Sequence, residues 1–281
     1  MIARCCYRIL AFVIALSFAA TVTAQQTQKP PASKPAGQKP PAQKPYEPSV
    51  GQEGKDVVWV PTPQTLVNKM LDMAKVTPTD FVIDLGSGDG RTVITAAKRG
   101  ARAMGIEYNP DMVELSKKNA AEAGVNERVS FMKADLFETD LTKADVITMF
   151  LLQSINMRLR PTLLSLKPGT RIVSNTFDME DWQPDETATV EEDCSGWCRA
   201  LLWIVPAKVE GMWQTPQGPM KLTQQFQMIS GSIGGKQIEE GRLRGEDITF
   251  KADGKTYTGR ITGNSMKGTI SGGGSWTATR G

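Results

Sequence analysis

Residues 82–91 read Val82-Ile83-Asp84-Leu85-Gly86-Ser87-Gly88-Asp89-Gly90-Arg91, and this stretch decides the fold. The apolar residues before Gly86 are typical of a buried strand, and the alternating glycines are typical of a tight turn that opens a helix. Glu107 stands at the end of the next apolar run. A glycine-rich turn followed about twenty residues later by an acidic residue is how a Rossmann-like sheet holds a nucleoside cofactor.

Apolar runs that suit strands alternate with segments of helical spacing from about residue 56 to residue 205. The predicted strands are Phe81–Leu85, Ala101–Glu107, Val129–Lys133, Ala144–Leu151 and Arg171–Asn175. The predicted helices are Pro63–Val76 with Thr62 as its N-cap, Arg91–Arg99, Asp111–Ala123 with Pro110 at its start after Asn109, and Met157–Leu166. This α/β alternation predicts a parallel sheet covered by helices on both faces. Residues 187–191 and 199–205 are expected to add an antiparallel pair, which makes seven strands within a domain of residues 50–206.

The composition changes after Pro206, where glycine and short alternating runs dominate residues 207–281. One motif recurs three times, as Gly231-x-Ile233-x-Gly235-x-x-Ile238, Gly241-x-Leu243-x-Gly245-x-x-Ile248 and Gly259-x-Ile261-x-Gly263-x-x-Met266. Each copy is typical of a strand, a tight turn and a second strand. We therefore predict a small all-β domain, an antiparallel meander or open barrel. Trp213 and Trp276 are expected to pack together as a plug, with an aromatic ligand platform as the alternative.

The first 24 residues are expected to be an export signal rather than part of the fold. Arg4 and Arg8 precede a short apolar run, and Val22-Thr23-Ala24 fits a cleavage site. An uncleaved anchor is the alternative. Either form would leave the rest of the chain outside the cytoplasmic membrane, in the periplasm, with no transmembrane segment after cleavage. Residues 25–49, rich in proline and lysine, are predicted to be an extended tether, with binding to an anionic envelope surface as the alternative.

The composition excludes several classes of site. The chain has no histidine, which removes histidine bases, histidine-activated nucleophiles and histidine metal ligands. Cys194 and Cys198 alone remain after cleavage, which is too few for a zinc site, so we expect no metal. In an oxidising compartment the pair would form a disulfide; a redox-active pair is the alternative, although the spacing is C-x3-C. The formal net charge of +3 includes no dense basic run, so nucleic acid is not favoured as a partner.

The glycine spacing and three acidic residues favour S-adenosylmethionine (SAM) over a dinucleotide. A dinucleotide site seats a pyrophosphate and needs a third glycine at a wider spacing, whereas SAM has no phosphate. We expect Asp84 to brace the turn or to receive the ammonium group of SAM. Glu107 is expected to accept the ribose hydroxyls, and Asp135, after the third strand, to accept the adenine amino group. The predicted cofactor-binding residues of this region are Asp84, Gly86, Ser87, Gly88, Gly90, Glu107 and Asp135.

With these residues the chain resembles the class I SAM-dependent methyltransferases over about residues 56–205. The resemblance rests on Asp84-Leu85-Gly86-Ser87-Gly88-Asp89-Gly90, Glu107 and Asp135. Together with Arg91, the stretch Trp59-Val60-Pro61-Thr62-Pro63 resembles a narrower group. That group includes bacterial methyltransferases of unassigned substrate and the mitochondrial lysine N-methyltransferases that act on the c-ring protein of ATP synthase. The resemblance implies a Rossmann-like seven-stranded methyltransferase sheet with SAM as the cofactor.

The resemblance also implies places for two further residues. Thr62 would lie over the methionine end of SAM, and Phe150, within Met149-Phe150-Leu151-Leu152-Gln153, would line the methyl-transfer face. This segment departs from the Asn/Asp-Pro-Pro-Tyr signature of amino-group methylation on adenine or glutamine, so those acceptors are less expected. Methyl transfer depends on proximity, alignment and exclusion of water, so the missing histidines are no objection. A lysine acceptor must first lose a proton, and Asp89 is one candidate base.

Two classes of function follow from the sequence. The first is a SAM-dependent methyltransferase that acts on a protein side chain, lysine among them, or on a small molecule. The second is an exported SAM- or nucleoside-binding or envelope interaction module with a degenerate methyltransferase fold. Intact Glu107 and Asp135 favour retained binding of SAM. The export signal favours the second class, because SAM is made in the cytoplasm.

Overall fold

The computed structural model describes residues 46–281. The predicted export signal, residues 1–24, lies outside the described residues, and so does the predicted tether up to residue 45. Within the described part of the chain, no helix combines the length and the apolar character that crossing a bilayer requires.

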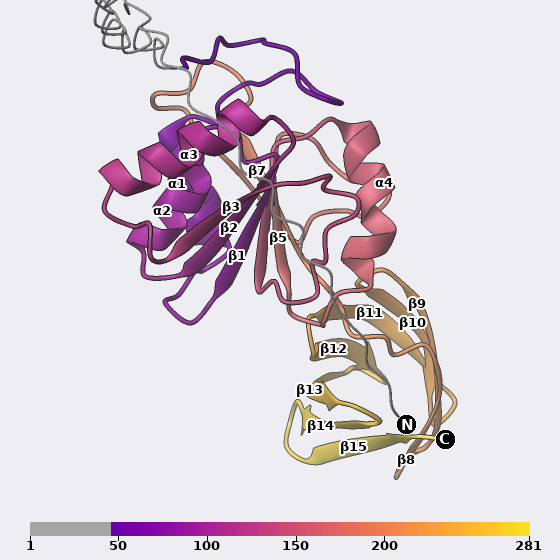
Figure 1. Cartoon of the computed structure of the whole chain (residues 1–281). Coiled ribbons are helices and arrows are strands. Elements are labelled where there is room, and N and C mark those ends of the chain that lie inside the picture. Colours follow the sequence, from indigo (N-terminus) through magenta and orange to yellow (C-terminus); the bar gives the residue numbers. More distant parts are fainter. Residues whose placement is uncertain (1–45) are drawn as a thin grey trace, which may run out of the picture. The chain divides into compact units, whose positions relative to one another are not determined.

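The α/β part is a single seven-stranded sheet with four helices (Figure 1). Its order is β3-β2-β1-β4-β5-β7-β6, with β1 to β5 parallel and β7 antiparallel to both of its neighbours. The predicted seven-stranded sheet is therefore confirmed. The elements are α1 (Gln64–Met73), β1 (Phe81–Leu85), α2 (Arg91–Lys98), β2 (Arg102–Glu107), α3 (Pro110–Glu122), β3 (Val129–Lys133), β4 (Val146–Met149), α4 (Gln153–Leu164), β5 (Arg171–Asn175), β6 (Glu186–Thr189) and β7 (Arg199–Ile204).

Two apolar layers hold the sheet between its helices. Successive side chains of a strand point to opposite faces. Val82 accordingly packs in one cluster with Leu66 of α1 and Val93 of α2, whereas Ile83 packs in the other with Leu159 of α4. Figure 1 shows α1, α2 and α3 on one side of the sheet and α4 on the other. Burial on both faces explains why these strands read as nearly continuous apolar runs.

The helix starts differ in part from the sequence prediction. α3 begins at Pro110 as predicted, and the Asn109 side chain caps it by accepting a hydrogen bond from the Asp111 amide at 2.9 Å. The prediction that Thr62 caps α1 is wrong: Pro63 holds the N-cap position and no side chain caps it. The Thr62 hydroxyl instead accepts a hydrogen bond from the Asn175 amide group at 3.3 Å. Thr62 is therefore tied to the end of β5 rather than to its own helix.

The C-terminal part is an eight-stranded barrel in meander order. The strands are β8 (Gly211–Thr215), β9 (Gly218–Gln225), β10 (Met228–Ile233), β11 (Lys236–Arg244), β12 (Asp247–Ala252), β13 (Lys255–Thr262), β14 (Ser265–Ile270) and β15 (Ser275–Arg280). The antiparallel meander is confirmed, and it closes rather than staying open, because β15 pairs with β8 through Thr279–Gln214 and Arg280–Trp213. Closure leaves no free strand edge. Gly245 and Gly263 have φ of +63° and +57° in the hairpin turns that the repeat predicted.

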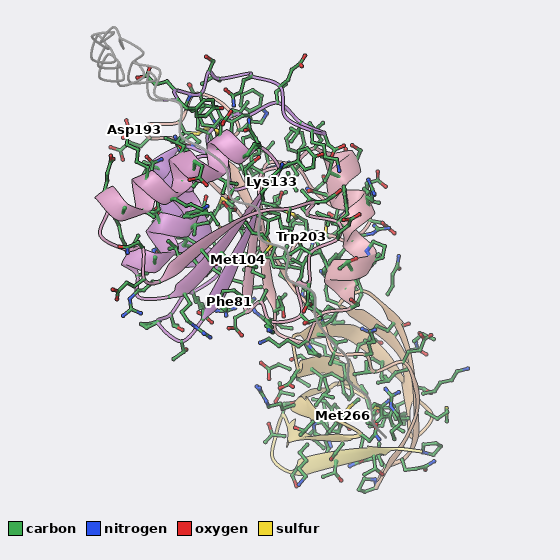
Figure 2. All side chains as sticks on the ribbon, viewed as in Figure 1. Phe81, Met104, Lys133, Asp193, Trp203 and Met266 are labelled. Atoms are coloured by element: carbon green, nitrogen blue, oxygen red, sulfur yellow. A yellow bond between two sulfur atoms is a disulfide. The ribbon has the colours of Figure 1, made fainter. Side chains whose placement is uncertain are left out.

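The barrel interior is packed with apolar side chains, among them Met266, which is labelled in Figure 2. Both tryptophans are buried here, as the core interpretation required. Both belong to one apolar cluster, in which the ring partners of Trp276 are Phe250 at 5.5 Å and Tyr257 at 6.0 Å. Trp213 donates its indole N–H to the Val209 carbonyl at 2.8 Å. The aromatic residues therefore fill the barrel rather than face a ligand.

Candidate functional site

The glycine turn between β1 and α2 has a backbone shape that needs its glycines. Gly86, Gly88 and Gly90 have φ of +74°, +53° and +82°, in the region that L side chains rarely adopt. A Cβ at Gly88 would stand 2.5 Å from the Trp59 indole nitrogen, and one at Gly90 would stand 2.9 Å from the Phe131 ring. The second contact shows that Gly90 lets α2 approach the sheet closely.

Hydrogen bonds fix this turn against the neighbouring strand and helix. The Gly86 and Ser87 amides both donate to the Ile106 carbonyl, at 2.9 and 3.0 Å. On the α3 side, the Ser116 hydroxyl donates to the Gly88 carbonyl at 2.7 Å. These hydrogen bonds hold the turn in its shape, which is the preorganisation that a binding site needs.

Glu107 joins the turn to the end of β2. One of its carboxylate oxygens accepts the Gly88 amide and the other accepts the Asn109 amide, each at 2.9 Å. A carboxylate has about four acceptor positions on its two oxygens. Each Glu107 oxygen therefore keeps capacity for a further donor, such as one of two neighbouring hydroxyls.

Asp84, at the end of β1, is almost fully buried, with 6% of its surface exposed. It accepts a hydrogen bond from the Thr148 hydroxyl at 2.6 Å. Burial raises the pKa of this carboxyl to about 7 in spite of that bond, and the charges of Asp89 and Glu107 add to the rise. A carboxyl of this kind is poised to ionise when a cation comes near it.

Asp135 follows β3 and is held from two directions. It accepts the Phe137 amide at 2.9 Å, and it forms an ion pair with the Lys55 ammonium group. The hydrogen bond from Lys55 is the main reason that the pKa of Asp135 lies below its usual value. Lys55 also stands 5.0 Å above the ring of Tyr108. This end of the site is therefore covered by a lysine from the N-terminal segment.

That segment, residues 51–59, folds back on itself through two backbone hydrogen bonds. The Gly51 amide donates to the Trp59 carbonyl at 2.8 Å, and the Trp59 amide donates to the Gln52 carbonyl at 2.9 Å. The closed loop carries Lys55 to Asp135 and the Trp59 indole to Gly88.

One pocket at the carboxyl edge of the sheet brings the predicted residues together. Eight of the nine predicted cofactor residues line it, namely Thr62, Asp84, Gly86, Ser87, Gly88, Glu107, Asp135 and Phe150. Gly90 does not line it, because its role is the packing of α2. Sequence reasoning did not assign Lys55, Trp59, Tyr108 or Arg91 to the site, although Trp59 belongs to the motif that signalled it.

Asp89, the candidate base, is held by its neighbour. Arg91 donates from Nε to Asp89 Oδ1 at 3.0 Å and from Nη2 to Oδ2 at 2.6 Å, and its Nη1 donates to the Thr62 carbonyl at 3.1 Å. Both carboxylate oxygens are thus engaged by the Arg91 guanidinium group. The geometry therefore assigns Asp89 to positioning Arg91 rather than to proton transfer.

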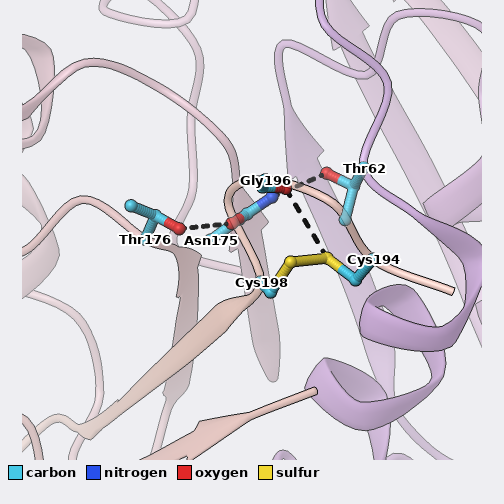
Figure 3. Close-up of a disulfide and its surroundings, with 6 residues drawn as sticks. All are labelled: Thr62, Asn175, Thr176, Cys194, Gly196 and Cys198. Carbon is cyan, nitrogen blue, oxygen red and sulfur yellow. Dashed lines mark hydrogen bonds between the residues drawn. A yellow bond between two sulfur atoms is a disulfide. The ribbon is translucent and has the colours of Figure 1, made fainter. Parts of the chain in front are cut away.

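Cys194 and Cys198 form a disulfide in the connection between β6 and β7, as Figure 3 shows. Their Cα atoms are 5.8 Å apart. The nearby Asn175, at the end of β5, accepts a hydrogen bond from the Thr176 hydroxyl at 2.9 Å and donates to Thr62 (Figure 3). Within residues 46–281, no three Cys, Asp or Glu side chains gather as potential metal ligands.

Comparison with known proteins finds methyltransferases both among family models and among curated relatives. The family model described as the ANTKMT methyltransferase domain matches residues 84–186. A protein-lysine N-methyltransferase of Saccharolobus islandicus (strain REY15A) is 45% identical over 139 residues, which are 48% of this chain and 86% of the relative. An adenine nucleotide translocase lysine N-methyltransferase of Mus musculus is 38% identical over 120 residues, 42% of this chain but only 52% of that relative.

One solved structure is similar to about half of this chain. It is described as an RNA methyltransferase from Salinibacter ruber in complex with S-adenosyl-L-homocysteine. It is 49% identical, with a TM-score of 0.50, and the match covers 53% of this chain and 96% of that one. The family match over residues 84–186 ends before β7 and the barrel begin.

The buried Asp84 carboxyl predicts a pH-dependent stability. Its unfolded form ionises near pH 3.8 and its folded form near 7, so between these values the folded state binds more protons and stability falls as the pH rises. At about 1.4 kcal/mol per pH unit, the loss reaches at most roughly 4 kcal/mol above pH 7. Asp84→Asn removes this dependence, so we expect its stability relative to the wild type to increase from pH 5 to pH 8.

Urea unfolding at several pH values measures this difference. Asp111→Asn, at an exposed position of α3, is the matched control and should keep a constant difference from the wild type. A constant difference for Asp84→Asn over the same range would contradict a protonated Asp84.

Proposed function

The chain belongs to the class I SAM-dependent methyltransferases, and from this premise we propose that it transfers the methyl group of SAM to a lysine side chain of a protein. The observation that carries the proposal is the convergence of three carboxylates on one pocket. Asp84, Glu107 and Asp135 stand at the ends of three adjacent parallel strands, and Phe150, directly after β4, lines the same pocket.

The residues present suit the chemistry of SAM. The free acceptor positions of Glu107 match two ribose hydroxyls, and Asp135 can accept from the adenine amino group. Asp84 is buried at the turn, where the ammonium group of the methionine part would favour its ionised form. Ser87 adds a buried hydroxyl that has no hydrogen-bond partner within residues 46–281. We propose these residues, with Thr62, Gly86, Gly88 and Phe150, as the cofactor-binding set.

The chain's contribution to the transfer is alignment and exclusion of water. When bound, SAM supplies a methyl group activated by a positively charged sulfur. The N-terminal loop with Lys55 and Trp59 covers one side of the pocket, and Leu151 and Ile155 give it an apolar wall. A lysine entering apolar surroundings has its pKa lowered, which favours the neutral amine that accepts a methyl group.

A lysine acceptor is supported by two independent observations. The Saccharolobus and Mus relatives are both named as lysine N-methyltransferases. The segment Met149-Phe150-Leu151-Leu152-Gln153 departs from the Asn/Asp-Pro-Pro-Tyr signature of amino-group methylation on adenine or glutamine. The Salinibacter structure is described as an RNA methyltransferase, so the experiments must compare RNA with protein as the methyl acceptor.

Cofactor binding is tested by titrating S-adenosylhomocysteine into the full chain. Glu107→Ala should weaken binding at least tenfold, on the order of 1.4 kcal/mol, because it removes the acceptors for the ribose hydroxyls and the anchor of Gly88. Isothermal titration calorimetry gives the affinities, and circular dichroism checks that the variant is folded.

Glu239→Ala, at an exposed position of the barrel, is the control and should bind as the wild type does. An unchanged affinity of Glu107→Ala would remove Glu107 from the site.

The acceptor class is tested with SAM that carries an isotopically labelled methyl group. Incubation with separate protein, RNA and small-molecule fractions, followed by mass spectrometry, should place the label on lysine side chains of proteins. With SAM kept below its dissociation constant for the wild type, the label should be strongly reduced with Glu107→Ala. Label confined to RNA or to small molecules would overturn the lysine assignment while leaving the methyltransferase activity intact.

We further propose that the chain is exported. The composition of residues 1–24 supports this, and so does the Cys194–Cys198 disulfide, since disulfides persist in oxidising compartments. An alkaline phosphatase fusion after residue 50 should be active, and mass spectrometry of the native protein from the periplasmic fraction should find SAM or its demethylated product. An inactive fusion would contradict export.

A further inference from the structure

Three aromatic side chains run from the wall of the pocket to the protein surface. The Phe150 ring lies 6.1 Å from the Phe177 ring and 6.1 Å from the Trp197 ring. Phe150 lines the pocket, whereas half of the Trp197 surface is exposed. An aromatic cluster at the wall of a methyl-transfer pocket is a surface that can receive an incoming side chain. We call these three residues the aromatic platform.

The chain builds this platform on unusual backbone. Thr176, which precedes Phe177, has φ of +62°, and Trp197 has φ of +54°. A β-branched residue in the left-handed region is an outlier that the surrounding structure must hold in place. Here the Thr176 amide donates to the Arg199 carbonyl at 2.6 Å, and the Phe177 amide donates to the Asn175 carbonyl at 2.7 Å. The position of Phe177 is therefore enforced rather than incidental.

The disulfide loop, residues 190–198, brings Trp197 to the same edge of the sheet. Because β7 is antiparallel to β5, β7 starts at the edge where β5 ends, and Trp197 of the loop before it lies beside Phe150. The Val190 amide donates to the Cys198 carbonyl at 2.9 Å, and the Cys194–Cys198 bond closes the loop around Trp197. The disulfide thus limits how far Trp197 can move.

The same loop carries three exposed carboxylates, Glu191, Glu192 and Asp193. Within residues 46–281, none of the three forms an ion pair. Figure 2 shows Asp193 beyond the end of the sheet that is opposite to Phe81, the first residue of β1. This loop therefore adds negative charge at the edge where the pocket lies, which attracts cations and repels phosphates.

We propose that the aromatic platform binds the acceptor lysine and that Glu191, Glu192 and Asp193 bind basic residues that flank it in a protein segment. The proposal rests on the proposed function, of which it specifies the substrate. An ammonium group is attracted to aromatic faces, and the lysine stem packs on them after its proton has passed to solvent water. Charge complementarity selects a basic protein segment over nucleic acid, although aromatic rings alone could also stack bases.

The test measures peptide binding separately from cofactor binding, on the full chain saturated with S-adenosylhomocysteine. The probes are a labelled peptide with one lysine flanked by arginines, the same peptide with glutamates in place of the arginines, and oligouridine. Fluorescence anisotropy gives the affinities. The basic peptide should bind at least tenfold more tightly than the acidic one and than oligouridine.

Two variants separate the platform from the charges. Trp197→Ala should weaken binding of the basic peptide fivefold or more. A triple variant, Glu191→Gln, Glu192→Gln and Asp193→Asn, should bring the basic and acidic peptides to similar affinity. The matched control, Glu210→Gln with Glu239→Gln, removes exposed carboxylates elsewhere and should change nothing.

The disulfide gives a third variant. The double variant Cys194→Ser, Cys198→Ser should weaken binding of the basic peptide, because the backbone around Trp197 is then less restrained. Affinity for S-adenosylhomocysteine should stay within twofold in every variant, which also shows that the pocket is folded.

The outcomes separate the two proposals. A wild-type chain that does not bind S-adenosylhomocysteine overturns the proposed function. Cofactor binding together with unchanged peptide affinity in the Trp197 and triple variants overturns only the platform. Tighter binding of oligouridine than of the basic peptide, lost in Trp197→Ala, reassigns the platform to nucleic acid.

Discussion

The hydrogen bond from the Gly88 amide to the Glu107 carboxylate is the constraint on which the site depends. It joins the glycine turn of β1 to the end of β2, and it turns Glu107 so that its remaining acceptor positions are available to a ligand. The turn can reach Glu107 because its glycines adopt backbone angles that other residues avoid. The same turn sets the start of α2, whose N-cap is Gly90, and the place of the Trp59 indole, which lies next to Gly88.

The two remaining carboxylates of the pocket show how one fold gives similar groups different charge states. Asp135 stands beside Lys55 and stays ionised, whereas Asp84 is buried without a cation and holds its proton to about pH 7. A protonated Asp84 avoids placing a third negative charge beside Asp89 and Glu107. An ammonium group in the pocket would reverse this balance, so cofactor binding and the protonation of Asp84 are coupled.

Local patterns predicted much of the fold, because strands buried on both faces and glycine turns leave signals within a few residues. Phe81–Leu85, Val129–Lys133 and Arg171–Asn175 are predicted to the residue. The start of α4 at Gln153 rather than Met157 and the shorter β4, Val146–Met149, are errors of element boundaries. Other errors have a common cause in contacts that are distant in sequence. Thr62 lost its capping role to a contact with Asn175, and Lys55 reaches Asp135 across 80 positions. Closure of the barrel likewise depends on β8 and β15, its first and last strands, which no local pattern relates.

The two ends of the pocket differ in how they are built, and the difference bears on specificity. The cofactor end uses short-range features of the shared sheet, namely the turn and the strand ends. The Trp197 end uses a strained turn at Thr176 and a loop closed by a disulfide, which lies after residue 186, where the family match stops. Loops beyond the carboxyl ends of parallel strands vary readily because the sheet does not depend on them. We therefore expect the loop of residues 190–198 to determine which acceptor this chain recognises. Because the Cys194–Cys198 disulfide closes that loop, the specificity would also depend on whether the compartment is oxidising.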